Sequence, residues 1–112
     1  MTVEGFVKKS GFRALTLPAP DREISGVYIG DLLSWVMGKA SPSDAWITIM
    51  SNVNVLAVAT LTDVCCIVLA EDVVLDDELL SLAEEKGVNV LSTPLSAYDA
   101  ALTMSDIAFK DR

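Results

Sequence analysis

Residues 21–37 read DREISGVYIGDLLSWVM and join a strand pattern to a helix pattern within one short segment. Apolar, β-branched and aromatic residues over 24–29 favour a strand. Gly30 interrupts that strand, and Asp31 is a residue type that caps helices, so we expect a short helix over 32–37. The segment holds no nucleophile beside a base, and it therefore predicts architecture rather than catalysis.

The short helix has an apolar stripe of Leu32, Trp35 and Val36, and Gly38 is expected to end it. Two uses of Trp35 stay open. It packs into the core, or together with Met37 it forms an exposed apolar patch for a dimer or a partner protein.

Strand and helix patterns alternate through the rest of the chain, with connections of a few residues. That alternation predicts an α/β fold in one domain: a mainly parallel open sheet of about four or five strands with helices on both faces. We expect a core over about 3–104 and a polar C-terminal tail over 105–112 of the single domain 1–112. The expected helices are 3–10, 32–37, 55–61, 77–86 and 94 onward, and the expected strands are 13–17, 24–29, 45–50, 63–69 and 88–92.

The helices carry several signals that a structure can test. Helix 55–61 is apolar on nearly all sides, which predicts that it is enclosed. Thr93 is expected to cap the last helix, with Pro94 as its first residue. The spacing of that helix predicts a core face of Leu95, Tyr98 and Leu102, while Thr2, Gly11, Asp76 and Gly87 mark the ends of the first and fourth helices.

Composition excludes several functional classes. The chain has 112 residues, 16 acidic against 8 basic, and a net charge of −8, so its surface repels the phosphates of nucleic acids. It contains no histidine, the commonest general base and metal ligand. Gly38-Lys39 resembles the end of a P-loop, but Leu33 and Ala40 stand where that loop requires Gly and Ser or Thr. We therefore expect no catalytic residues and no enzyme activity.

Cys65 and Cys66 are the only cysteines, and they are adjacent. Neighbouring strand residues point to opposite faces, so a disulfide between them is strained, and we expect two free thiols that fill a buried strand. Free cysteines fit a reducing cytoplasm. The first residues lack the apolar core of a signal peptide, and no apolar run approaches the ~20 residues of a membrane helix. The expected protein is cytoplasmic, with neither nucleic-acid nor membrane partners.

A ligand-binding site is expected where the parallel strands end, because ligands of open α/β sheets sit beyond the carboxyl ends of the strands. Backbone N–H groups at helix starts there can hold an anion or a nucleotide, so we expect a nucleotide as the possible ligand and no other cofactor. Helix capping alone is the competing explanation for several of these residues. The candidate residues are Gly30, Asp31, Ser51, Asn52, Asn54, Glu71, Ser92 and Thr93, with the polar cluster Ser51, Asn52 and Asn54 as first choice.

Two groups of carboxylates, Glu71-Asp72 and Asp76-Asp77-Glu78, allow a weak cation site as an alternative. A solvated loop and a helix start that favours negative charge explain the same residues without a metal. We therefore assign no metal ligand.

Several motifs follow one another in a recognisable order: Asp21-Arg22, Gly26, Tyr28, Asp31-Leu32-Leu33-Ser34, the strand 46–50, Asn52, Asn54 and the segment Glu84 to Thr93-Pro94. This order resembles the DRTGG domain family over about residues 3–104, and in particular its short stand-alone members from anaerobic bacteria, which are related to the N-terminal domain of HPr kinase/phosphorylase. The Thr-Gly-Gly element is not intact at either candidate position, Ile24-Ser25-Gly26 or Ala70-Glu71-Asp72.

The resemblance implies a non-catalytic α/β regulatory domain that forms homodimers. It also implies an enzyme partner, such as a redox enzyme or one that handles acetyl phosphate. The expected function is a regulatory or ligand-sensing domain that binds a nucleotide or another small anionic metabolite. The alternatives are an assembly subunit without a small ligand, and an enzyme that uses a carboxylate-bound metal at Glu71 and Asp72.

Overall fold

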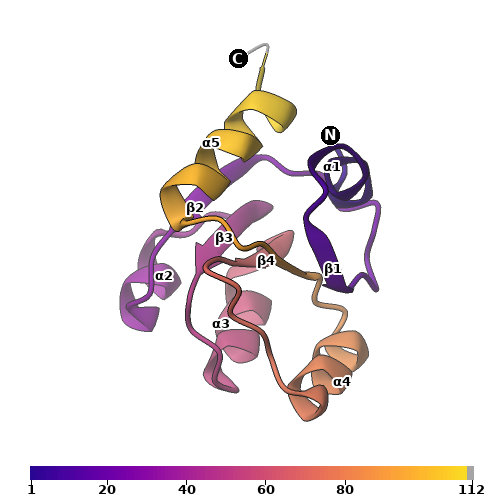
Figure 1. Ribbon diagram of the computed structural model, residues 1–112. Helices are drawn as coiled ribbons and strands as arrows, with labels where there is room; N and C mark the ends of the chain where they lie inside the picture. Colours follow the sequence, from indigo (N-terminus) through magenta and orange to yellow (C-terminus); the bar gives the residue numbers. More distant parts are fainter. Residues whose placement is uncertain (111–112) are drawn as a thin grey trace.

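The computed structural model describes residues 1–110, and Figure 1 shows its helices and strands. The predicted alternation of strands and helices is confirmed, with element ends shifted by a few residues. In chain order the elements are α1 (Val3–Ser10), β1 (Arg13–Thr16), β2 (Gly26–Ile29), α2 (Leu33–Lys39), β3 (Asp44–Thr48), α3 (Asn54–Thr62), β4 (Cys66–Leu69), α4 (Asp77–Lys86), β5 (Val90–Ser92) and α5 (Ala97–Ala108).

The strands form one mixed sheet in the order β1-β5-β4-β3-β2. Strands β2 to β5 are parallel neighbours, whereas β1 pairs with β5 in the antiparallel direction. Each parallel strand lies beside the next one along the chain. Successive right-handed crossovers in one direction place their helices on the same face, so α2, α3 and α4 share a face of the sheet.

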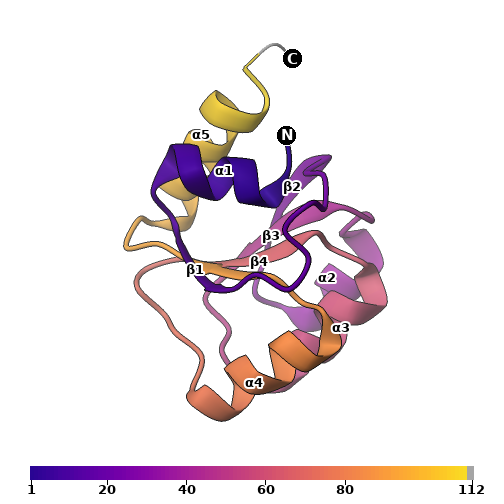
Figure 2. The ribbon, with the colours of Figure 1, turned by 90° about the vertical axis from the view of Figure 1, so that its right-hand side faces the viewer.

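Figures 1 and 2 show the resulting three layers, with α1 and α5 covering the other face. Side chains of β4 alternate between the two faces: Cys66 and Val68 join the core beneath α1 and α5, whereas Ile67 and Leu69 join the core beneath α2, α3 and α4. A strand buried on both faces is apolar throughout, which explains the unbroken apolar run in the sequence. The predicted α/β class with helices on both faces is confirmed.

Local cap chemistry sets the ends of α1 and α4 as predicted. The Thr2 hydroxyl accepts a hydrogen bond from the Gly5 N–H at 3.0 Å, and the Asp76 carboxylate accepts one from the Leu79 N–H at 2.9 Å. Both helices end at a glycine in the left-handed conformation, Gly11 and Gly87.

The predicted details of α2 are wrong in three respects. Asp31 does not cap it: the helix starts after Leu32 without a side-chain cap, because the Thr48 hydroxyl at the end of β3 and the Ile49 N–H just after it bind the Asp31 carboxylate. Gly38 does not end it either, and the helix continues through Lys39. Trp35 lies at the surface with 60% of its area exposed, so its core-packing alternative is also wrong.

The predicted orientations of α3 and α5 also need correction. Helix α3 is not enclosed: its outer side faces solvent, and Leu61 is 71% exposed. Helix α5 starts at Ala97 under a Ser96 cap, because the Thr93 N–H still bonds to the β4 residue Leu69 and keeps the chain in the sheet. Its buried side carries Ala100 and Met104, whereas Tyr98 and Leu102 are exposed. Leu95 precedes the helix and packs against the core beneath α1 and α5, so its predicted core contact is confirmed.

The end of the chain is more ordered than the predicted polar tail over 105–112. Helix α5 continues to Ala108, and Ile107 and Phe109 pack against the core beneath α1 and α5. Residues 111–112 lie outside the described part of the chain.

Candidate functional site

The carboxyl ends of the four parallel strands meet at one edge of the sheet, here called the carboxyl edge. Ile29 lies beside Ile47, Thr48 beside Leu69, and Leu69 beside Ser92. The eight candidate residues lie at these strand ends, in the loops that follow them or at the start of α3, so the structure brings them to a common edge.

Gly30 and Asp31 form the β2 end of the carboxyl edge, and the Gly30 carbonyl and the Asp31 carboxylate both accept hydrogen bonds from within the protein. The Asp31 carboxylate accepts hydrogen bonds from the Thr48 hydroxyl at 2.7 Å and from the Ile49 N–H at 3.0 Å. The Gly30 carbonyl accepts a hydrogen bond from the buried Trp46 indole at 2.8 Å. A Cβ at position 30 would lie 2.8 Å from the Tyr28 ring, so a larger residue here requires that ring to move. The pair positions the loop after β2.

The polar cluster after β3 forms the middle of the carboxyl edge. The Asn52 side-chain oxygen accepts a hydrogen bond from the Asn54 N–H at 2.9 Å, and the Asn52 carbonyl accepts one from the Val55 N–H at 3.1 Å. Asn52 therefore opens α3, as the capping explanation requires. Ser51 and Asn54 are exposed, which leaves their side chains facing solvent at this edge.

The β4 and β5 ends of the carboxyl edge are tied together by backbone hydrogen bonds. The Glu71 N–H donates to the Leu95 carbonyl and the Asp72 N–H to the Thr93 carbonyl, at 2.8 and 3.0 Å. Thr93 is buried, and its hydroxyl accepts from the Leu95 N–H. Ser92 is buried as well. Of these candidates only Glu71 presents its side chain to solvent.

Glu71 and Asp72 adopt consecutive left-handed conformations, with φ of 59° and 61°. A residue with a Cβ is destabilised by about 1–2 kcal/mol in this region of φ, whereas glycine adopts it without strain. These are the positions of the second candidate for the family's Thr-Gly-Gly element. The backbone there is one that two glycines would adopt without strain.

The double change Glu71→Gly and Asp72→Gly is expected to raise the free energy of unfolding by about 1–2 kcal/mol, because it relieves the φ strain at both positions. Glu71→Gly should contribute more than Asp72→Gly, since aspartate tolerates the left-handed region better than glutamate. Urea denaturation measures the change. The alanine double variant is the control: it removes the same charges and keeps the strain, and an equal gain from it would contradict this explanation.

The carboxyl edge is acidic, since Asp31, Glu71 and Asp72 are all exposed there. The carboxylates do not converge: within residues 1–110 no three acidic or cysteine side chains are grouped closely enough to hold a metal ion. An anionic ligand at this edge therefore needs a cation of its own to offset the local negative charge.

Arg22 lies at the opposite edge, where the parallel strands begin. Its guanidinium donates hydrogen bonds to the Asp63 carboxylate at 3.1 Å and to the Asp63 carbonyl at 2.9 Å, and it lies 3.4 Å from the Ser43 hydroxyl. These bonds join the loop before β2 to the turn before β4. Arg22, the second residue of the opening motif, therefore holds two loops together at the edge opposite the carboxyl edge.

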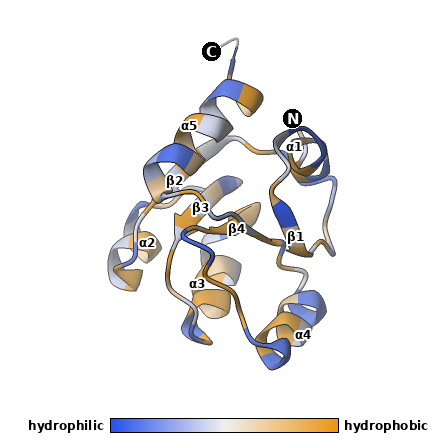
Figure 3. Ribbon diagram, in the orientation of Figure 1, coloured by the Kyte–Doolittle hydropathy of each residue, from blue (hydrophilic) through white to orange (hydrophobic). Residues whose placement is uncertain are grey.

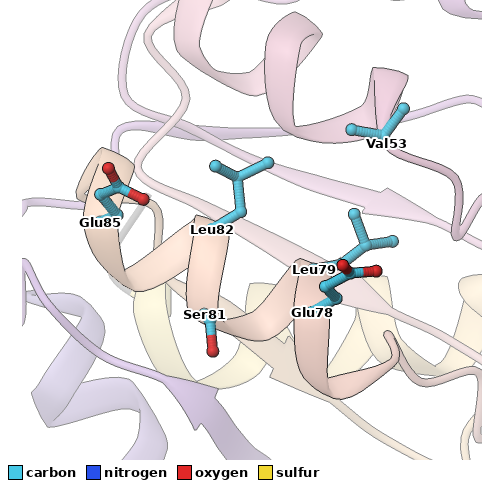
Figure 4. A pocket seen from close by; sticks show the side chains of 6 residues that line it. All are labelled: Val53, Glu78, Leu79, Ser81, Leu82 and Glu85. Atoms are coloured by element: carbon cyan, nitrogen blue, oxygen red, sulfur yellow. The ribbon is translucent and has the colours of Figure 1, made fainter.

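A groove of about 420 Å³ lies between the start of α3 and the length of α4. Figure 4 shows Leu79 and Leu82 pointing from α4 toward the α3 side, where Val53 lies, with Glu78 and Glu85 nearer the two ends of α4. Sequence reasoning did not identify this groove. The only signal for it is the Leu79 and Leu82 pair flanked by Glu78 and Glu85 in the sequence.

Cys65 and Cys66 are free and buried, as predicted, and their sulfur atoms lie 3.8 Å apart. The hydrogen bond between the two thiols and the burial of Cys66 raise its pKa well above the ordinary value of a cysteine. In the folded protein Cys66 therefore stays a neutral thiol at a pH where it ionises in the unfolded chain.

Folding stability is expected to fall as pH rises above about 8.5, the pKa of an unfolded cysteine, because ionisation of the Cys66 thiol then favours the unfolded chain. Below that pH the contribution is fully present. Free energies of unfolding measured from pH 7 to pH 10 test this. The variant Cys66→Ala should be less stable at pH 7 and lose less stability across the range, and parallel curves would contradict the role of Cys66.

No helix within residues 1–110 combines the length and apolar character that crossing a membrane demands. A search of curated proteins gives no match to the chain.

A solved structure has a similar fold: the CBS and DRTGG domains of the regulatory region of the Clostridium perfringens pyrophosphatase, complexed with the activator diadenosine tetraphosphate. The two share 14% sequence identity with a TM-score of 0.71. The match covers 92% of this chain but only 45% of the pyrophosphatase chain, so the likeness extends to part of that regulatory region.

The family model for the DRTGG domain matches residues 21–107, which include β2 to β5, the carboxyl edge and the Arg22 contacts. That span is most of the chain and agrees with the resemblance seen in the sequence. The chain belongs to the DRTGG domain family, a family of regulatory domains.

Proposed function

We propose that this chain is a non-catalytic regulatory domain that binds a nucleotide at its carboxyl edge. The observation that carries the proposal is the shared fold with a regulatory region crystallised with a nucleotide activator. The exposed side chains of Ser51, Asn54 and Glu71 supply donors and acceptors at this edge. The chain has no histidine to activate a serine, which supports sensing rather than catalysis. Its two free cysteines support a cytoplasmic location.

The acidity of the carboxyl edge sharpens the proposal. A nucleotide phosphate placed near Asp31 and Glu71 meets like charge, and a divalent cation carried by the phosphates reverses that repulsion. Binding should therefore be stronger for the magnesium complex of the nucleotide than for the free nucleotide.

Thermal unfolding with ATP, AMP or diadenosine tetraphosphate, each with and without magnesium, tests the proposal. A ligand at 100 times its dissociation constant stabilises the native state by about 2.7 kcal/mol, which raises the melting temperature by several degrees. Ser51→Ala with Asn54→Ala should reduce the shift. Ser41→Ala is the matched control, because Ser41 is exposed in the loop that leads into β3 from the opposite edge.

The absence of any shift across the three nucleotides would contradict nucleotide binding. ATP turnover above the buffer rate that disappears in the Ser51 and Asn54 variant would contradict the non-catalytic part of the proposal.

Assembly with another protein is a second candidate function, and a separate observation favours it. Leu32, Trp35 and Leu61 are largely exposed on α2 and α3 or beside them, and exposed large apolar side chains are a feature of interaction sites.

A further inference from the structure

The groove between α3 and α4 has the side-chain pattern of one half of a coiled coil. Leu79 and Leu82 are three residues apart, the spacing of positions a and d in a heptad. Glu78 and Glu85 then fall on successive g positions, which form ion pairs between the helices of a coiled coil. Ala83, at position e, is fully buried in the core beneath α4. The a, d and g side chains of α4 therefore line the groove (Figure 4).

The other helix beside the groove, α3, is uncharged and partly apolar on its outer side. Asn54–Thr62 contains no acidic or basic residue. Val53, Ala57 and Leu61 follow one another at intervals of four residues and are all exposed, so they form one stripe along the helix, here called the α3 stripe. A helix of another molecule can therefore pack beside α3 without burying a charged side chain of α3.

The charge on α4 indicates what kind of helix fits the groove. Figure 3 shows α4 with an apolar segment between hydrophilic ends. The exposed carboxylates of this helix are those of Asp77, Glu78, Glu84 and Glu85. Its one basic residue, Lys86, lines a separate hollow of about 100 Å³ rather than the groove. A basic helix therefore meets opposite charge here, whereas a second copy of this chain, with net charge −8, brings like charge.

We propose that the α3–α4 groove docks an amphipathic, basic helix of another protein, with apolar residues at its a and d positions and Lys or Arg at its e or g positions. The apolar side chains of that helix pack between the α3 stripe and the two leucines of α4, as helices docked in grooves do. Its cations lie beside Glu78 and Glu85, which are seven residues or about 10 Å apart along α4. The docking site rests on the second candidate function, assembly with another protein, and gives the partner a chemical class.

A labelled synthetic peptide with leucine at a and d and lysine at e and g of successive heptads, here called the lysine peptide, tests the docking site. Fluorescence anisotropy with the full chain should give a dissociation constant on the order of 10 µM. A peptide of the same composition, shuffled so that it has no apolar face, should bind at least about tenfold more weakly. Equal binding of the two peptides shows attraction of charge alone and would overturn the proposal, as would no binding of the lysine peptide at about 1 mM.

Charge reversal on α4 locates the docked helix. Glu78→Lys and Glu85→Lys should each weaken binding of the lysine peptide about tenfold, because like charges then meet at the groove. Glu84→Lys is the matched control: Glu84 is exposed on the same helix and undergoes the same change of charge, but it does not line the groove. It should weaken binding by no more than about twofold. Equal effects of Glu84→Lys and Glu85→Lys would contradict docking in the groove.

Reversing the charge of both partners tests the pairing without relying on a loss of binding. The double variant Glu78→Lys with Glu85→Lys should prefer a peptide with glutamate at e and g to the lysine peptide, whereas the wild-type chain prefers the lysine peptide. Both changes are at exposed positions, and circular dichroism checks that the variant is folded. A folded double variant that still prefers the lysine peptide, or that binds neither, would overturn the pairing with these glutamates.

Trp35→Ala separates this docking site from assembly through α2. Trp35 is 60% exposed on α2 and does not line the groove, so Trp35→Ala should leave binding of the lysine peptide unchanged. If Trp35→Ala abolishes binding and Glu85→Lys does not, assembly with another protein stands and docking in the groove fails. A wild-type dimer that the lysine peptide dissociates would assign the groove to a second copy and would also overturn the proposal. Thermal shifts with nucleotide, measured without peptide, report on the carboxyl edge alone.

Discussion

Replacing Trp46 with alanine is expected to lower the free energy of unfolding by about 3–5 kcal/mol, the cost of removing a large aromatic side chain from a core. Trp46 is fully buried beneath α2, α3 and α4, and its indole N–H donates to the Gly30 carbonyl at 2.8 Å. Domains of this size have total stabilities of about 5–15 kcal/mol. The variant should therefore lose much of its stability in urea, as followed by circular dichroism.

Trp46→Phe separates packing from hydrogen bonding at the same position. The phenyl ring retains much of the apolar contact but leaves the Gly30 carbonyl without its indole donor, and we expect a smaller loss of about 1–3 kcal/mol. Tyr98→Ala is the surface control and should change stability by less than about 0.5 kcal/mol. Equal losses for Trp46→Ala and Tyr98→Ala would contradict the central packing role of Trp46.

Much of the fold was predictable because its determinants are local. Asp76 caps α4, a cap that needs only the preceding turn, and Gly87 ends the same helix in the conformation that glycine favours. The apolar strand that ends at Leu69 is recognisable because a strand enclosed between two layers has no polar side. The strand–helix alternation then leaves few topologies, and the observed sheet follows from it.

The errors arose where a distant residue competes with a local signal. Asp31 stands where a helix cap is expected, yet the Thr48 hydroxyl, which belongs to another strand, binds its carboxylate. On α5, Tyr98 and Leu102 are four residues apart, and so are Ala100 and Met104. Periodicity alone therefore does not determine which pair is buried. The sheet chooses the side with Ala100 because a small residue lets the helix approach closely.

The candidate site could likewise be predicted only in part from the sequence. Sequence order was sufficient to place all eight residues at the ends of parallel strands, since topology alone determines that edge. It was insufficient to show which of them are already bonded within the protein. Thr93 is buried and bonded to the Leu95 N–H, whereas Ser51 and Asn54 remain exposed, and only the folded arrangement distinguishes these cases.

Replacing Asn89 with leucine is expected to lower the free energy of unfolding by about 3 kcal/mol or more. Asn89 is buried, and its side-chain amide donates to the Ala19 carbonyl at 2.7 Å and to the Cys65 carbonyl at 2.9 Å. Its carbonyl oxygen accepts from the Ala19 N–H at 2.9 Å. Leucine has a similar volume but removes these bonds from the Ala19 N–H and the Cys65 carbonyl, whereas the Ala19 carbonyl keeps the Arg22 N–H at 3.3 Å. A buried group without a partner costs about 1–3 kcal/mol.

The consequence of that loss is local as well as global, because Asn89 connects the segment before Asp21 to β4. Amide hydrogen exchange at Ala19 should accelerate in Asn89→Leu beyond the change that global destabilisation explains, since the N–H loses its acceptor. Asn54→Leu is the matched control: it replaces an exposed asparagine and should change stability by less than about 0.5 kcal/mol. An equally small loss of stability in Asn89→Leu and Asn54→Leu would contradict this role of Asn89. The segment before Asp21 would then be held mainly by other contacts, such as the Arg22 bonds to Asp63.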